Sequence, residues 1–247
     1  MSSPYDPKQY WEHRLGNCFN YQGVGNIGFS EAYNSWLYRR KKRCIESFFR
    51  ETTLKGKHVL DVGCGTGFFI KWYLQHGADV CGIDITETST RELEKLYDCK
   101  FFTQDIASPS YQPYREFDIV NMWDVVYHVI EPAAFNRIFD NISNSLKEGG
   151  ILLFTDWFGA ASDVRIAEHV QTRCLDTYRQ MLSPRFKLVT VCPLYNILNK
   201  PHLPILDNYM GWLFFLVDNL TRKVSRDNLS LAVWRYSRMN SLPGASN

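Results

Sequence analysis

Residues 59–69 read Val-Leu-Asp-Val-Gly-Cys-Gly-Thr-Gly-Phe-Phe, so an apolar strand-like run leads into three alternating glycines and an apolar helical pattern follows. Glycines let the backbone turn sharply and approach a ligand closely, because no Cβ stands in the way. The N-terminal N–H groups of the following helix point to the same place. A dinucleotide-binding loop reads G-x-G-x-x-G, whereas position 68 here is Phe. The spacing therefore predicts a ligand that lacks a pyrophosphate.

The composition indicates a globular chain with no strong charge bias. Apolar residues make up 45% and charged residues 22%, and the formal net charge is +2 over 247 residues. A nucleic-acid partner is not expected, because such proteins carry a strongly basic face. The seven cysteines are scattered without a C-x-x-C pair, which indicates a reducing compartment and no structural zinc site. We find no signal peptide and no membrane span, so the expected location is the cytoplasm.

Outward from the glycine loop, strand and helix patterns alternate along the chain. Connections of this length require parallel pairing, and helices then cover both faces of the sheet. We expect an α/β fold with a doubly wound, seven-stranded, mostly parallel sheet, an antiparallel final strand, and helical N-terminal and C-terminal lid segments. Strands are expected at 58–63, 78–85, 100–103, 117–123, 151–155, 186–192 and 229–235, and core helices at 67–76, 88–97, 132–147 and 163–182.

Acidic residues stand at the carboxyl ends of the first three strands. Asp61 lies in the glycine stretch, and Asp84 follows the loop by about twenty residues, where an acid can accept hydrogen bonds from ribose hydroxyls. Asp105, followed by Ile106, comes after the third strand. Any one such acid is more often a turn or N-cap residue. Three acids in register with the loop, by contrast, are a specific signal for a ligand site at this edge of the sheet.

With this loop and these acids, the chain resembles the class I S-adenosylmethionine-dependent methyltransferases, whose first motif reads acidic-x-G-x-G-x-G after strand one. The resemblance covers residues 57–156. It extends more loosely to small-molecule methyltransferases through Tyr127-His128, His169 with Arg173, and Pro193-Leu194-Tyr195. It implies S-adenosylmethionine as methyl donor, S-adenosylhomocysteine as product and a small-molecule acceptor. The implied cofactor contacts in the core are Asp61, Gly63, Cys64, Gly65, Asp84, Ile85, Asp105, Ile106 and Trp123.

Residues 1–55 are expected to form a helical cap or lid. In the helix expected at 8–22, Tyr10, Trp11 and Arg14 can share one face. An amphipathic surface helix usually just covers a core. The resemblance favours a lid, in which an aromatic ring covers the adenine and Arg14 meets the methionine carboxylate in a charge-assisted pair. Tyr10 and Arg14 are therefore assigned to the cofactor.

A second N-terminal helix is expected at 31–53, with the basic run Arg39-Arg40-Lys41-Lys42-Arg43 at its centre. The run resembles a localisation or nucleic-acid patch. Consecutive residues spread around a helix, however, and such runs are usually solvated. We therefore expect a solvated surface here.

The candidates for catalysis are two histidines. His128 is the first choice for a general base and His169 the second, because histidine can take a proton near neutral pH; the alternative is a packed histidine that only shapes the pocket. The acceptor is expected to contact Tyr33, Tyr127, Arg173 and Trp212. Asp124 and Asp156 could in principle supply the carboxylates of a metal site. Their spacing shows no dedicated ligand set, so no metal is expected.

The methyltransferase domain is expected to span residues 56–240, with a frayed tail at 241–247. Within it, the insertion 193–227 contains a helix that is apolar on most sides and therefore needs cover. That helix is too short to span a bilayer and lacks the basic face of an interfacial helix. We expect a substrate lid with a contact in a homodimer; the alternative is ordinary core packing.

The expected reaction is an in-line displacement, in which an oxygen or nitrogen of the acceptor attacks the sulfonium methyl without a metal. One rival is a nicotinamide-dependent oxidoreductase, which shares the sheet and the ribose acid but requires the other glycine spacing. A second rival is a binding module that keeps the cofactor pocket without catalysis. The sequence leaves this second rival open.

Overall fold

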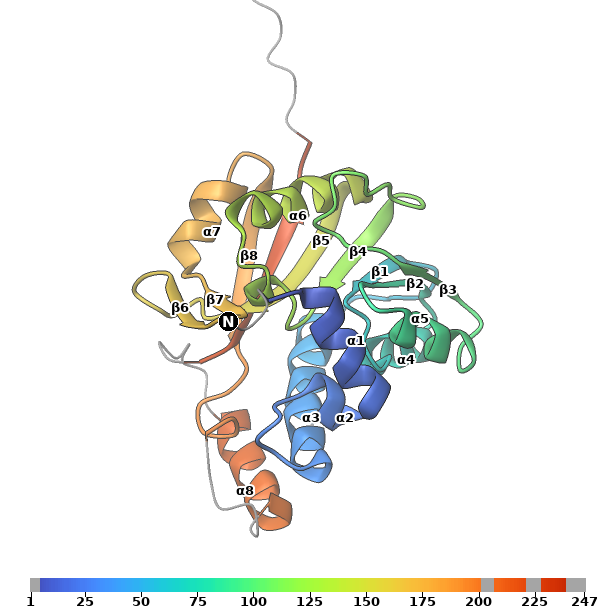
Figure 1. The fold of residues 1–247 in the computed structure, drawn as a ribbon. Helices are drawn as coiled ribbons and strands as arrows, with labels where there is room; N and C mark the ends of the chain where they lie inside the picture. The colour runs from blue at the N-terminus through green and yellow to red at the C-terminus, as the bar shows by residue number, and fades with distance from the viewer. Residues whose placement is uncertain (1–4, 201–206, 221–227, 239–247) are drawn as a thin grey trace, which may run out of the picture.

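In a computed structural model, which describes residues 5–200, 207–220 and 228–238, a seven-stranded sheet runs through the molecule (Figure 1). Its strand order is β3-β2-β1-β4-β5-β9-β8. The first five strands pair in parallel, and β9 runs antiparallel to both β5 and β8. The expected sheet is thus confirmed. The strands are β1 His58–Val62, β2 Asp79–Asp84, β3 Lys100–Thr103, β4 Phe117–Met122, β5 Leu146–Asp156, β8 Phe186–Pro193 and β9 Ser230–Tyr236.

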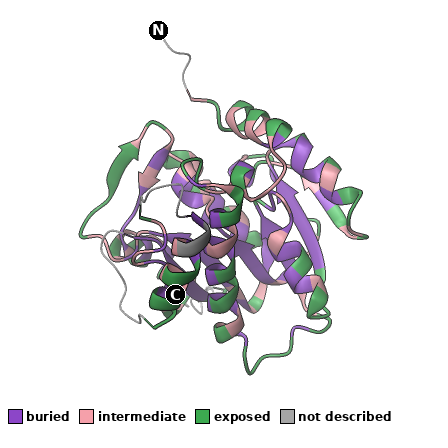
Figure 2. Cartoon of the chain, turned by 90° about the horizontal axis from the view of Figure 1, so that it is seen from below, coloured by how far each residue is buried: buried purple, intermediate pink, exposed green. Residues whose placement is uncertain are grey.

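Two layers of helices bury the two faces of this sheet. Side chains of successive strand residues point to opposite faces, so Val59 joins one apolar cluster and Leu60 the other. Figure 2 shows the strands buried between partly exposed helices. The doubly wound arrangement is therefore confirmed. One layer holds α3 Glu31–Phe48, α4 Phe68–Gln75 and α5 Glu87–Glu94, and the other holds α6 Pro132–Ser145 and α7 Leu175–Leu182.

The expected helix at 8–22 is divided into α1 Pro7–Asn17 and α2 Tyr21–Val24. The division falls at Asn20, whose side chain accepts hydrogen bonds from the N–H groups at positions 22 and 23 and so caps a new helix. α1 contacts α5, and α2 contacts α3. The N-terminal segment is therefore fastened to the helical layer that faces the glycine loop.

The expected helix at 163–182 is wrong over residues 163–174. Residues 164–172 form a hairpin of β6 Val164–Ala167 and β7 Val170–Thr172, and only α7 remains helical. The hairpin is rich in β-branched residues, which favour strands. Asp163 accepts hydrogen bonds from the Cys174 N–H and the Thr177 hydroxyl, and this fixes the start of α7. His169 consequently lies at the hairpin turn and not on a helix.

The boundary after α6 also differs from the expectation. The helix ends at Ser145 and β5 begins at the next residue, so Gly149-Gly150 lie inside the strand and do not terminate the helix. Gly149 has φ = 73°, a left-handed conformation that glycine adopts readily. The strand is thus longer than its apolar run, which begins at Ile151.

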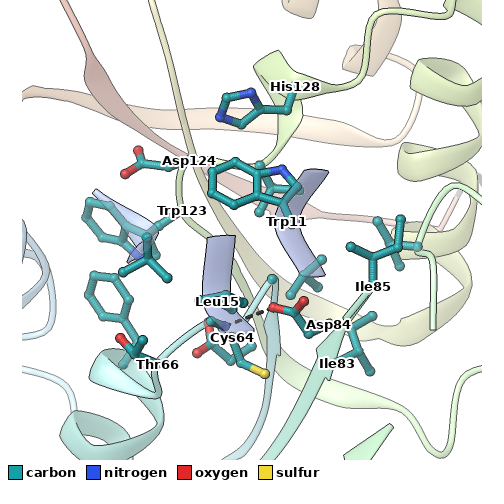
Figure 3. A pocket seen from close by; sticks show the side chains of 18 of the residues that line it. Trp11, Leu15, Cys64, Thr66, Ile83, Asp84, Ile85, Trp123, Asp124 and His128 are labelled. Atoms are coloured by element: carbon teal, nitrogen blue, oxygen red, sulfur yellow. Dashed lines mark hydrogen bonds between the residues drawn. The ribbon is translucent and has the colours of Figure 1, made fainter. Parts of the chain in front are cut away.

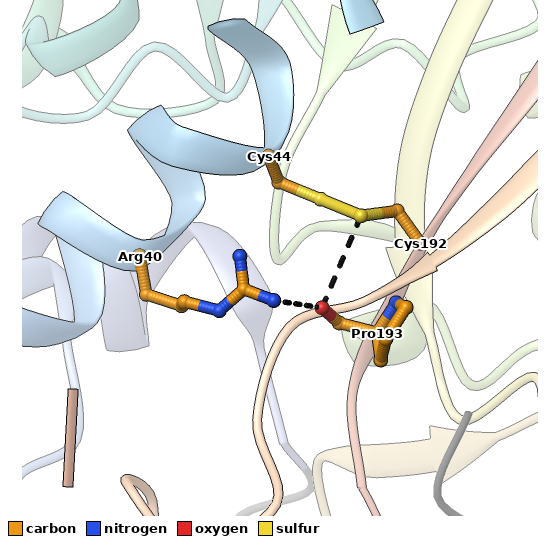
Figure 4. The surroundings of a disulfide bond; sticks show 4 residues. All are labelled: Arg40, Cys44, Cys192 and Pro193. Carbon is orange, nitrogen blue, oxygen red and sulfur yellow. Dashed lines mark hydrogen bonds between the residues drawn. A yellow bond between two sulfur atoms is a disulfide. The ribbon is translucent and has the colours of Figure 1, made fainter. Parts of the chain in front are cut away.

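Two of the scattered cysteines are joined. A disulfide links Cys44 of α3 to Cys192 of β8, and beside it Arg40 donates a hydrogen bond of 2.7 Å to the Pro193 carbonyl (Figure 4). Cysteine spacing gave no sign of this pair, because 148 positions separate the two residues. The link fastens α3 to the edge of the sheet.

Within the insertion 193–227, the structure describes the helix α8, Asp207–Leu220, which packs against α3 (Figure 1). In the described part of the chain, no helix is long and apolar enough to cross a membrane. The expected tail at 241–247 lies outside the described residues, as do positions 201–206 and 221–227 of the insertion.

Candidate active site

A pocket lies where β1, β2 and β4 end, and α1 contributes Trp11 and Leu15 to its lining (Figure 3). This is the edge of a doubly wound sheet at which ligands bind. All nine core residues assigned to the cofactor line the pocket: Asp61, Gly63, Cys64, Gly65, Asp84, Ile85, Asp105, Ile106 and Trp123. The residues predicted from the sequence thus come together in one pocket.

Two positions of the glycine loop, Gly63 and Gly65, have no room for a side chain. Gly63 has φ = 69°, and a Cβ there would stand 2.4 Å from Val125 Cγ2. Gly65 has φ = 51°, and its Cβ would stand 2.9 Å from Val24 Cγ1. Both positions therefore require glycine on two grounds, backbone conformation and close approach. The loop forms an open cradle next to the start of α4.

Asp84 joins the glycine loop to the end of β2. Its Oδ2 accepts a 2.9 Å hydrogen bond from the Gly65 N–H, and its Oδ1 accepts from the Thr86 N–H and hydroxyl at 3.0 and 2.8 Å. Burial raises the pKa of this carboxyl, and these hydrogen bonds oppose the rise. Asp84 thus fixes the loop and also lines the pocket.

Asp105 and Ile106, which lie shortly after the end of β3, also line the pocket. Asp105 is exposed, and its Oδ1 accepts a 2.8 Å hydrogen bond from the Ala107 N–H. Ile106 is buried and presents an apolar surface. One carboxylate oxygen therefore holds the turn, which is the ordinary role of an acid at a strand end.

Asp61 belongs to a buried polar network that the sequence did not reveal. Asn121 donates a 2.6 Å hydrogen bond to Asp61 Oδ1, and the Trp123 indole N–H donates one of 2.6 Å to Asn121 Oδ1. The Trp123 ring stacks on Phe69, with the ring centroids 4.6 Å apart. Burial raises the pKa of Asp61 to about 7. The network sets the orientation of both Asp61 and Trp123 at the pocket wall.

The expectation that the basic run on α3 is a solvated surface is wrong for two of its five residues. Arg40 and Lys41 are buried, at 6% and 3% exposure. Lys41 lines the pocket, forms an ion pair with Asp124, and places its Nζ 4.2 Å from the centroid of the Tyr38 ring. Asp124 itself has φ = 57° and is held by Thr155. A lysine inside a basic run gave no signal that distinguished it from its exposed neighbours.

The α1 residues that line the pocket are not Tyr10 and Arg14, which the sequence assigned to the cofactor. Pro7, Trp11 and Leu15 line the pocket at i, i+4, i+8 spacing. Arg14 instead donates hydrogen bonds to the carbonyls of Gln22 and Gly25, at 2.9 and 3.0 Å. Arg14 therefore holds the connection to α2. Of the residues near this end, Trp11 provides the aromatic surface in the pocket.

Glu12 fastens this cover to the core. Its carboxylate accepts hydrogen bonds from the N–H groups of Glu87 and Thr88, at 2.8 and 3.0 Å, and from the Thr88 hydroxyl. These N–H groups open α5, where an acid is stabilised by unpaired donors and by the helix dipole. Glu12 thus helps to hold α1 across the pocket, together with Lys8, whose Nζ lies 3.9 Å from the Glu87 carboxylate.

The two candidate histidines lie together, but only His128 lines the pocket. Their rings are stacked with centroids 5.6 Å apart, and His128 Nδ1 lies 3.0 Å from the His169 carbonyl oxygen. A carbonyl only accepts, so His128 Nδ1 carries the proton and Nε2 keeps its lone pair. Burial lowers the pKa of His128 to about 4. His169 contacts Tyr10, with the ring centroids 5.2 Å apart, and Tyr10, which the sequence assigned to the cofactor, is not among the residues that line the pocket.

The four residues assigned to the acceptor do not converge. Tyr33 is buried in the core, and its hydroxyl donates to the Leu198 carbonyl. Trp212 is 54% exposed on α8. Tyr127 is buried next to His128, with its ring centroid 5.2 Å from that of Trp157. Of the four, Tyr127 is thus the one that contacts a pocket residue through its ring.

Arg173 is buried, and its guanidinium donates to the carbonyls of Val126, Val129 and Gln171 while lying 3.6 Å from the Phe135 ring centroid. We expect Arg173→Met to lower the free energy of unfolding by about 2 kcal/mol, since buried acceptors lose charged donors. The Tm should fall by roughly 4–8 °C. Calorimetry checks this, with exposed Arg179→Met as the control. An unchanged Tm with a raised KM for the acceptor would contradict it.

Asp124 and Asp156, the two acids whose spacing the sequence analysis tested for a metal site, bind protein groups in the structure. Asp156 Oδ2 accepts a 2.5 Å hydrogen bond from the Tyr178 hydroxyl and another from the Arg173 N–H. Burial raises the pKa of Asp156 to about 7. Asp124 faces Lys41 instead. In residues 5–200, 207–220 and 228–238, no group of three His, Cys, Asp or Glu side chains converges as a metal site would require.

A sheet of this order, with a glycine cradle after β1 and acids after β2 and β3, defines the class I, Rossmann-like methyltransferases. A family model described as "Methyltransferase domain" matches residues 33–198. The chain belongs to this methyltransferase family.

Among curated proteins, the "Ubiquinone biosynthesis O-methyltransferase" of Coxiella burnetii (strain RSA 493 / Nine Mile phase I) is 36% identical over 115 residues, which cover 43% of this chain and 46% of that protein. The protein of the same name from Acinetobacter baylyi is 30% identical over 41% of this chain and 44% of its own length. The chain therefore matches about half the length of these relatives.

Two solved structures share the fold. One is magnesium protoporphyrin IX methyltransferase (ChlM) from Synechocystis PCC 6803 with bound SAM; the TM-score is 0.64 at 16% identity, over 96% of this chain and 100% of the other. The second is N-methyltransferase NodS from Bradyrhizobium japonicum WM9 with S-adenosyl-L-homocysteine; the TM-score is 0.59 at 15% identity, over 92% and 97%.

Proposed function

We propose that the protein transfers the methyl group of S-adenosylmethionine to an oxygen or nitrogen of a small-molecule acceptor, by in-line displacement and without a metal ion. The observation that carries the proposal is the pocket formed by the glycine cradle, Asp84 and the buried Asp61 network. We propose the cytoplasm as the location, from the sequence and from the five cysteines that stay free beside the Cys44–Cys192 disulfide.

The pocket residues suit the parts of this cofactor. Asp84 would accept hydrogen bonds from the ribose hydroxyls, and Ile106 would pack against the adenine ring. The methionine end carries one ammonium and one carboxylate, and the wall near Trp123 offers Asp61 for the first and Lys41 for the second. Lys41 takes the role that the sequence assigned to Arg14, because Arg14 is engaged with backbone carbonyls.

S-Adenosylmethionine supplies an already activated methyl group, so the protein has mainly to position the acceptor and exclude water. Trp11 and Leu15 exclude water from above the cradle. For a hydroxyl acceptor, His128 Nε2 would take the proton as the oxygen attacks. The His169 carbonyl holds the His128 tautomer that leaves Nε2 free of a proton, so that His169 acts as a positioning residue.

Lys41→Met is expected to weaken binding of S-adenosylhomocysteine by about 10- to 150-fold, as one charged hydrogen bond contributes about 1.5–3 kcal/mol. The matched control is Lys42→Met, because Lys42 is exposed on the same helix and pairs with Glu46. Titration calorimetry measures both variants. Equal affinity of Lys41→Met and wild type would remove Lys41 from the cofactor site.

The test of the proposed function is transfer of label from methyl-labelled S-adenosylmethionine to a panel of phenols, amines and carboxylic acids, with and without EDTA. We expect a labelled product of at least one acceptor, formed at the same rate in EDTA. Binding of the cofactor without transfer across the panel would favour the binding module. Loss of activity in EDTA would overturn the metal-independent mechanism.

A further inference from the structure

The outer side of α8 is apolar and open to solvent. Five large apolar residues follow one another at i, i+1, i+4, i+5 and i+8, a spacing that gathers them on one side of a helix. We call them the outer face of α8. Their exposed fractions are 54% for Trp212, 45% for Leu213, 42% for Leu216, 40% for Val217 and 84% for Leu220.

The acids of α8 point inward, which is the reverse of an ordinary surface helix. Asp218 is fully buried and accepts hydrogen bonds from the N–H groups at positions 196, 197 and 198, at 3.0–3.1 Å. Asp207 is buried and accepts from the Ser30 N–H. Among the α8 side chains that the structure describes, Asn219 is the sole exposed polar one. The helix thus presents apolar groups outward and no exposed acid.

Cationic groups lie next to this helix on α3. Gly211 lets the two helices approach closely, since a Cβ there would stand 2.4 Å from Trp36. The Arg39 guanidinium lies 4.2 Å from the centroid of the same Trp36 ring. Arg39 and Arg43 are exposed and one turn apart. The basic face that the α8 sequence lacks is therefore supplied by its packing partner.

Two occupants would cover such a face, a second copy of the chain or a lipid surface. The outer face of α8 extends over about 14 Å of helix at 1.5 Å per residue, whereas a standard protein interface uses about 20–30 residues on each side. A short apolar face flanked by arginines matches the needs of an interfacial helix, whose apolar side enters the headgroup boundary while cations meet anionic lipids.

We propose that the outer face of α8 docks the protein on anionic lipid bilayers, with Arg39 and Arg43 at the headgroups. The docking helix packs on α3, which also carries Tyr38 and Lys41 of the pocket. The docked membrane would therefore lie next to α3, the helix that contributes these two residues to the pocket wall. This docking does not depend on methyl transfer.

The test is co-sedimentation of the full chain with vesicles of phosphatidylcholine alone or mixed with phosphatidylglycerol. We expect sedimentation with the mixed vesicles, less with phosphatidylcholine, and weakening by salt. Leu213→Glu/Leu216→Glu should abolish it, and Arg39→Gln/Arg43→Gln should reduce it on mixed vesicles. The control is Leu96→Glu/Ile166→Glu, which adds the same charges at positions 62% and 55% exposed elsewhere.

Absence of sedimentation in the wild type, or full sedimentation of Leu213→Glu/Leu216→Glu, would overturn the proposal. A concentration-dependent dimer that this variant abolishes, without binding to vesicles, would instead assign the face to a second copy. The same variants are titrated with S-adenosylhomocysteine, whose affinity should equal that of wild type. Failure of docking is thereby separated from failure of the cofactor site.

Discussion

Asp84→Asn should weaken binding of S-adenosylhomocysteine by about 10- to 150-fold, which corresponds to about 1.5–3 kcal/mol for a hydrogen bond to a charged group. The carboxylate accepts from the Gly65 N–H on one oxygen and from Thr86 on the other. An amide cannot accept on both sides, so the glycine cradle loses its anchor and the ribose loses its acceptor.

Titration calorimetry measures this loss, and thermal unfolding verifies that the variant is folded. Asp79→Asn is the matched control, because Asp79 begins the same strand but is exposed and pairs with Arg115 far from the cradle. A folded Asp84→Asn protein with wild-type affinity would show that the acid at the end of β2 does not contact the cofactor.

The second large effect is expected at His128. His128→Gln should lower kcat by about 10²- to 10⁴-fold for a hydroxyl acceptor, the usual contribution of a general base. The control is His13→Gln, an exposed histidine on α1. If His128→Gln retained near-normal turnover, the enzyme would work by proximity alone.

The pKa of His128 also predicts how its protonation state and the stability of the protein depend on pH. Burial lowers that pKa to about 4, so His128 stays neutral and able to accept a proton through pH 5–7. Its folded pKa lies below the unfolded value near 6.5. The unfolded chain therefore binds more protons between these values, and stability is lost as the pH falls from 6.5 towards 4, by about 3 kcal/mol in full.

Asp61 and Asp156 change the stability with pH in the opposite direction to His128. Burial raises the pKa of each to about 7, so their contribution is fully present below pH 4 and is lost as the pH rises through 7. Unfolding followed from pH 7.5 to 4 in wild type and His128→Gln separates the two effects. The variant should gain stability relative to wild type as the pH falls.

The features that the sequence predicted are those encoded locally. The glycine loop and the acids at positions 84 and 105 follow strands in fixed spacing, so their convergence needs only the parallel sheet. Trp11 and Arg14 show the limit of this reasoning. Both lie on α1, but the direction in which the helix packs decided that Trp11 enters the pocket and Arg14 meets backbone carbonyls.

Other features depend on contacts between distant segments. Lys41 is distinguished from its basic neighbours by Asp124, which is far along the chain. The hairpin at 164–172 replaced a helix because strand pairing outweighed an apolar spacing that also suits a helix. An apolar run in the sequence does not tell which side of α8 packs on α3 and which side carries the exposed residues of the outer face.

The central claim is that the cradle binds a nucleoside sulfonium cofactor and not a dinucleotide. The most direct test is calorimetric titration of the full chain with S-adenosylhomocysteine and, separately, with NAD. The account predicts saturable one-to-one binding of S-adenosylhomocysteine, none of NAD, and loss of binding in Gly65→Val, where a side chain would stand 2.9 Å from Val24. Saturable binding of NAD without binding of S-adenosylhomocysteine would contradict it.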